Sequence, residues 1–96
     1  MVFGFLKKGA DRLMESNYAK IAGMSVDSLR YQIKNATPVS SKRMYILVLA
    51  EKGQMSEAID ACRNYDLGSR DFSMFLTIKK AEPVALMLMK KLDEGY

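Results

Sequence analysis

The apolar residues of the chain are most concentrated in one run near its middle, from Met44 to Ala50. Seven consecutive apolar or aromatic residues suit either a buried strand or a helix that is packed on every side. Only Ile46 and Val48 in this run are β-branched, and Gly53 follows it at a position typical of a helix end. The pattern therefore predicts a central helix over about residues 41–52, which the other helices must surround.

Shorter amphipathic periods on both sides of this run predict further helices. They cover residues 2–15, 18–22, 26–35 and 57–64, a segment that starts at Ser69 or Asp71, and residues 84–92. Ser16-Asn17 is expected to begin the second of these and Ser56 to cap the helix over 57–64. Pro83 suits the first turn of the last helix. The predicted fold class is all-α: a single compact domain, residues 1–96, of about six short helices around the central one.

The segment from Tyr18 to Asn35 predicts two helices joined by a tight turn. Ala19 is small enough to let the two helices approach, and Gly23 can take a left-handed conformation between them. Met24 would fill the corner, and Ser25 would cap the second helix. The apolar residues of that second helix then face inward, which leaves its opposite side free to enter a major groove.

The sequence of this segment, AKIAGMSVDSLRYQ, resembles that of the first helix pair in the MerR family of transcription regulators, which commonly reads AK-x-x-GVSVDTLRYY. The resemblance covers residues 18–34 and implies binding of double-stranded DNA with a regulatory role. Carried over by position, it places Ser25, Val26, Arg30 and Tyr31 at or near the DNA. The sequence departs from the family pattern in two ways. A predicted helix precedes the motif, and Gln32-Ile33-Lys34 replaces the usual acidic residue and Gly-Leu wing start.

The basic residues are concentrated in the first half of the chain. Residues 1–43 hold eight lysines and arginines against three acidic residues, whereas residues 44–96 hold seven against eight. An anionic partner is therefore expected to meet the first half. Under the DNA-binding hypothesis, Arg30 should contact a base edge or a phosphate, and phosphates should be contacted by Lys20, Lys34, Lys42 and Arg43.

Several kinds of chemistry lack the residues they need. The chain has no histidine and one cysteine, Cys62, which excludes a zinc cluster, an internal disulfide and the Ser-His and Cys-His nucleophile pairs. No phosphate-binding glycine pattern is present. We therefore expect a non-enzymatic cytoplasmic protein without cofactor or metal, in which Cys62 is a buried, inert thiol. No apolar run is long enough to span a membrane.

The sequence is also compatible with two other kinds of partner, a protein and a membrane surface. In the last helix, Val84, Leu88 and Leu92 form one face. Leu86 and Met89 point away from it, so they are expected to contact a second copy or another protein. A small helical adaptor or inhibitor is thus the alternative function, and the eight methionines would suit an adaptable groove as well as a core. Residues 2–14 could also dock on the core or lie on a membrane surface.

Overall fold

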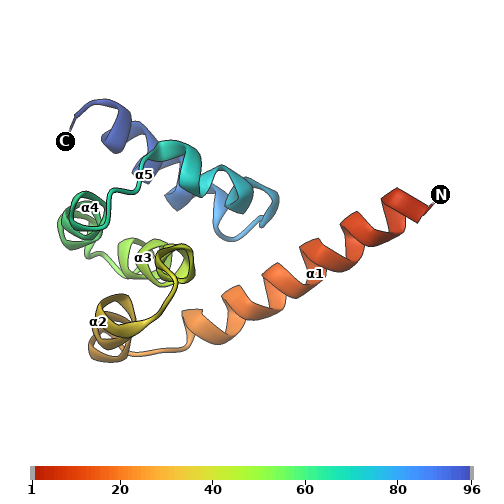
Figure 1. Ribbon diagram of the computed structural model, residues 1–96, viewed down its shortest axis with the longest axis horizontal. Coiled ribbons are helices and arrows are strands. Elements are labelled where there is room, and N and C mark those ends of the chain that lie inside the picture. Colours follow the sequence, from red (N-terminus) through yellow and green to blue (C-terminus); the bar gives the residue numbers. More distant parts are fainter. Residues whose placement is uncertain (1, 96) are drawn as a thin grey trace.

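All regular elements in the described part of the chain are helical, which confirms the all-α prediction (Figure 1). The structure, a computed structural model, describes the backbone of residues 2–95 and the side chains of residues 12–95. Five α-helices and two 3₁₀ segments follow one another along the chain. They are α1 (Val2–Ala22), α2 (Val26–Asn35), η1 (Val39–Ser41), α3 (Lys42–Glu51), α4 (Met55–Asn64), η2 (Ser69–Thr77) and α5 (Glu82–Asp93).

Helix α3 is the centre of the molecule, as the apolar run predicted. The residues from Ile46 to Leu49 are at most 1% exposed, and Ala50 is also buried. All six other helical elements contact α3. A helix without a polar face is stable in water only when other elements cover it on every side. The chain therefore folds around its most apolar segment.

Helix α1 is one continuous helix of 21 residues, so the predicted break at Ser16-Asn17 is wrong. Serine and asparagine inside a helix each cost only about 0.5 kcal/mol relative to alanine, which packing can offset. Met14, Tyr18 and Ile21 recur at helical spacing and pack on the core across the expected break. The remainder of α1 runs out from the other helices toward the amino terminus (Figure 1). The side chains before Arg12, on which a membrane contact of residues 2–14 depends, lie outside the described residues.

Two other element predictions also need correction. The segment from Ser69 is a 3₁₀ helix, in which residues three apart lie on the same side, so Phe72 and Phe75 are both buried. Helix α4 begins at Met55, so Ser56 does not cap it. Pro83, by contrast, lies in the first turn of α5 as predicted.

Gly53 and Gly23 each follow the end of a helix but differ in conformation. Gly53 has a φ of +93°, whereas Gly23 is not left-handed. The left-handed conformation predicted for Gly23 is therefore wrong. A Cβ at Gly23 would lie 3.5 Å from the carbonyl oxygen of Lys20, an ordinary contact. We expect Gly53→Ala to cost about 1–2 kcal/mol of stability, whereas Gly23→Ala should cost nothing or add up to about 1 kcal/mol. Urea unfolding measures both values, and a larger loss at Gly23 would contradict this reading.

Candidate nucleic-acid interface and methionine cleft

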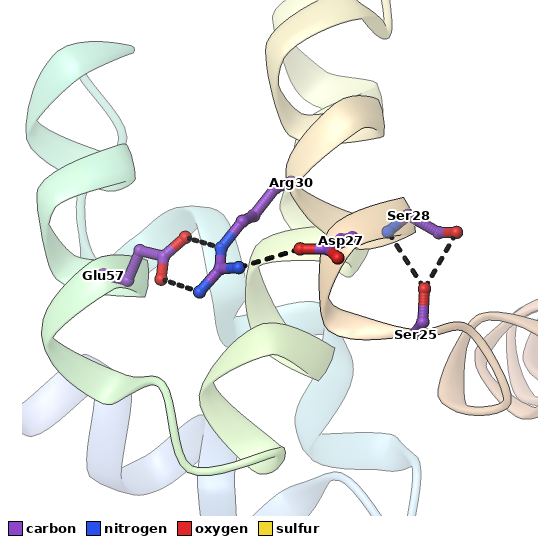
Figure 2. Close-up of polar contacts among 5 residues, drawn as sticks. All are labelled: Ser25, Asp27, Ser28, Arg30 and Glu57. Carbon is purple, nitrogen blue, oxygen red and sulfur yellow. Dashed lines mark hydrogen bonds and ion pairs between the residues drawn. The ribbon is translucent and has the colours of Figure 1, made fainter.

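Helix α2, the predicted recognition helix, begins as its sequence indicates. Ser25 is the N-cap residue, with φ −72° and ψ 160°, and its Oγ accepts a hydrogen bond of 3.1 Å from the backbone N–H of Ser28 (Figure 2). Leu29 and Ile33 are buried, as predicted for the inward face. Asp27 in the first turn complements the helix dipole.

Arg30 is on the outer face of α2, but two carboxylates hold its guanidinium (Figure 2). Its Nε and Nη2 donate to the two oxygens of Glu57 on α4 at 2.7 and 3.0 Å, and Nη1 donates to Asp27 at 3.0 Å. The hydrogen bonds to Glu57 are the main cause of a raised pKa for Arg30, and the same bonds lower the pKa of Glu57. Arg30 thus joins α2 to α4 and is not a free cation.

The Arg30–Glu57 pair should make a small, acid-sensitive contribution to stability. Because the pKa of Glu57 is lowered in the folded state, the contribution is present above its ordinary value of 4.5 and is lost as the pH falls through the lower folded pKa. We expect Glu57→Gln to be less stable than the wild type near pH 7 and equally stable at low pH, with a modest difference because both side chains are exposed. Thermal unfolding across this range measures the effect. Asp60→Asn, which removes an exposed charge on the same helix, should show no such convergence.

The rest of the outer face of α2 is exposed but not strongly basic. Tyr31 is 65% exposed, and Lys34 is exposed beside it. Arg30 and Lys34 line a shallow depression together with the acidic side chains of Glu57 and Asp60. With Asp27 included, carboxylates outnumber cations on this face. Unpaired lysines and arginines supply the affinity of a protein for a phosphate backbone, so the excess of carboxylates on this face disfavours DNA binding.

Lys42 was predicted to contact DNA phosphate, and the structure contradicts this prediction. Its side chain is only 4% exposed. The Nζ atom donates hydrogen bonds to the backbone carbonyl oxygens of Ile33 and Lys34 and lies 4.3 Å from the ring centroid of Tyr65. These carbonyls end α2 and have no partners within the helix. Lys42 therefore closes the end of α2 from inside the protein, and no phosphate can reach it.

The helix pair also departs from the predicted packing. Helix α2 packs mainly against α3, and α1 also meets α3. Ala19 is exposed and borders a different depression, beside Glu51 and Thr77. It therefore does not lie between α1 and α2, where the prediction placed it. Val26 is half-buried against the core, which removes most of its side chain from a DNA-facing surface.

The other two predicted phosphate contacts, Lys20 and Arg43, lie at an open cleft of about 730 Å³ between α1 and the rest of the molecule. Four of the eight methionines line this cleft. They are Met14 and Met24 on the side of α1, Met44 on α3 and Met74 on η2. The other apolar lining residues are Ile21, Ala36, Tyr45 and Phe75. The sequence alone did not reveal this cleft, because its methionines come from segments that are distant along the chain.

The exposed apolar residues of α5 differ in part from the prediction. Leu86 is 50% exposed, as expected, but Met89 is half-buried and packs against the core. Met89 is three residues from Leu92 on the helix, so it shares the inward face. The other large apolar side chain that α5 exposes is that of Met87, which is 53% exposed. A contact through α5 would therefore involve Leu86 and Met87.

The remaining candidate chemistry is limited. Cys62 is buried, and burial raises the pKa of its thiol to about 12, with a smaller contribution from Asp71. Among the described residues, no three cysteine or acidic side chains are grouped as metal ligands, and no helix there is long and apolar enough to cross a membrane. The chain matches no protein-family model, no curated protein and no solved structure.

Proposed function

We propose that the protein is a non-enzymatic interaction module that binds an apolar segment of another protein in the methionine cleft. The observation that supports this function is that half of the methionines gather in one open cleft. Methionine is unbranched and polarizable, so a surface lined by it can adapt to different apolar side chains. Leu13, 65% exposed and one turn before the lining residue Asn17, adds an exposed apolar side chain on α1 close to the cleft.

The choice between this function and DNA binding rests on charge. On α2, Arg30 is held by carboxylates, and Lys42 is buried below the helix. The cleft, by contrast, is open and lined by more apolar than polar residues, and no carboxylate of residues 12–95 lines it. An exposed apolar surface of this kind is typical of protein contacts.

A titration with a model helix tests the proposal. The probe is an uncharged amphipathic peptide of about 15 residues, long enough to form a marginal helix, with leucines on one face and glutamine and serine elsewhere. In protein labelled with ¹³C at the methionine methyl groups, we expect resonance shifts at Met14, Met24, Met44 and Met74, and none at Met87.

Two substitutions provide a matched comparison for this titration. Met74 is 38% exposed at the cleft, and Met87 is 53% exposed on α5. Met74→Gln should weaken peptide binding by about 3- to 10-fold, the loss expected for removing part of a buried methionine contact. Met87→Gln should leave the affinity unchanged. If no cleft resonance shifts, or if only Met87 responds, the cleft is not the binding site.

A second candidate is DNA binding with a regulatory role through α2. It is favoured by Tyr31 and Lys34, which are exposed and are not covered by α1. If α2 contacts phosphates, affinity for a mixed-sequence duplex should fall with a log–log salt slope of about −0.9 per contact. Glu57→Gln should then strengthen binding by releasing Arg30, and Lys34→Gln should weaken it. Fluorescence anisotropy measures both changes, and absence of binding at about 50 mM salt would exclude this function.

A further inference from the structure

We propose that the partner segment in the methionine cleft is an acidic amphipathic helix, an inference that rests on the proposed protein-binding function. A partner segment can add a strand to a sheet edge or lay a helix into a groove. The described part of the chain contains no strand and thus offers no sheet edge. The cleft runs beside α1, which presents a helical wall against which a second helix can pack.

The charge of the partner follows from the two cations at the cleft. Lys20 on α1 is exposed, and Arg43 at the start of α3 is half-buried, with its Nε donating to the carbonyl oxygen of Ser40 at 2.9 Å. Neither forms an ion pair with a carboxylate among residues 12–95, in contrast to Arg30. Among residues 12–95, the lining includes no aspartate or glutamate, so Lys20 and Arg43 are its charged side chains and give the cleft a basic character beside its apolar residues. A helix with carboxylates beside its apolar face complements this arrangement.

The same charges disfavour a second copy of this chain as the occupant. The first half of α1 contains Lys7, Lys8 and Arg12. Helix α5, which exposes Leu86 and Met87, has two lysines in its last turn, balanced by Glu82 and Asp93, so it has no net charge. The segment of α1 would bring a net positive charge toward Lys20 and Arg43, which opposes association, and α5 lacks the net negative charge that would complement them. The occupant is therefore a different protein.

Three peptides with the same leucine face test the inference. Their flanking positions carry glutamate, glutamine or lysine, and the methionine methyl resonances report on binding in each case. Exposed ion pairs contribute modestly, so two of them should make the glutamate peptide bind about 2- to 30-fold more tightly than the glutamine peptide. The lysine peptide should bind most weakly, and the differences should shrink as the salt concentration rises.

Charge removal on the protein completes the test. The double substitution Lys20→Gln, Arg43→Gln should make the glutamate and glutamine peptides bind with equal affinity. The matched control Lys52→Gln, Lys90→Gln removes the same charge from exposed positions outside the cleft, and it should preserve most of the difference. Circular dichroism establishes that both variants keep the helical content of the wild type.

The possible outcomes separate the two proposals. If all three peptides shift the cleft methionines with equal affinity, the inference of an acidic partner is wrong and the interaction module stands. If none of the peptides shifts them, the proposed function itself fails. If duplex DNA shifts them and the double substitution abolishes that effect, Lys20 and Arg43 bind a nucleic acid, and the acidic-helix inference is overturned.

Discussion

Leu47→Ala should lower the free energy of unfolding by about 2–5 kcal/mol, the range observed when a fully buried leucine is truncated. Leu47 is in the middle of α3 and is 0% exposed. The surrounding helices all pack on α3, so the cavity has little room to collapse. Because small domains have a total stability of about 5–15 kcal/mol, this one change should remove a large part of it. Urea unfolding followed by circular dichroism measures the loss.

The control for this prediction is the same substitution on the surface. Leu86 is 50% exposed on α5, so Leu86→Ala should change the stability by less than about 0.5 kcal/mol. If the two substitutions had similar effects, α3 would not be the element around which the chain packs. A preserved peptide affinity in Leu86→Ala would also show that α5 does not contribute to the proposed binding site.

Lys42→Ala should cost about 2–4 kcal/mol of stability, although lysine is usually a tolerant surface residue. The substitution removes a charged donor from two carbonyl oxygens at the end of α2 and a cation from the ring of Tyr65. A hydrogen bond to a charged group contributes about 1.5–3 kcal/mol, and a cation–π contact about 0.5–2 kcal/mol. Chemical denaturation measures the loss, and amide hydrogen exchange should show α2 opening more readily.

Two further substitutions separate the charge of Lys42 from its bulk. Lys42→Met keeps the aliphatic stem, so a cost well above that of an exposed position would come from the unpaired carbonyls. Lys20→Ala removes an exposed lysine from the neighbouring helix and should cost less than about 0.5 kcal/mol. If Lys42→Met were neutral, the buried ammonium group would make no net contribution, as happens for some buried charges.

The features that the sequence predicted correctly depend on residues close together along the chain. The burial of α3 follows from one uninterrupted apolar run, and the start of α2 follows from a serine three residues before the N–H group that it accepts from. The inward positions of Leu29 and Ile33 follow from the helical period. Local pattern and capping determine such features, so their prediction required no knowledge of the fold.

The tertiary structure decided the features that join distant residues. Glu57, 27 residues beyond Arg30, converts a predicted DNA contact into an ion pair, and the end of α2 draws Lys42 into the interior. Packing carries α1 through a serine and an asparagine that predicted a break. The methionine cleft likewise forms from α1, α3 and η2 together. By itself, the sequence determined most of the helical segments and which of them is central. The partners of its charged and methionine side chains came only from tertiary packing, because no local period encodes contacts between separate helices.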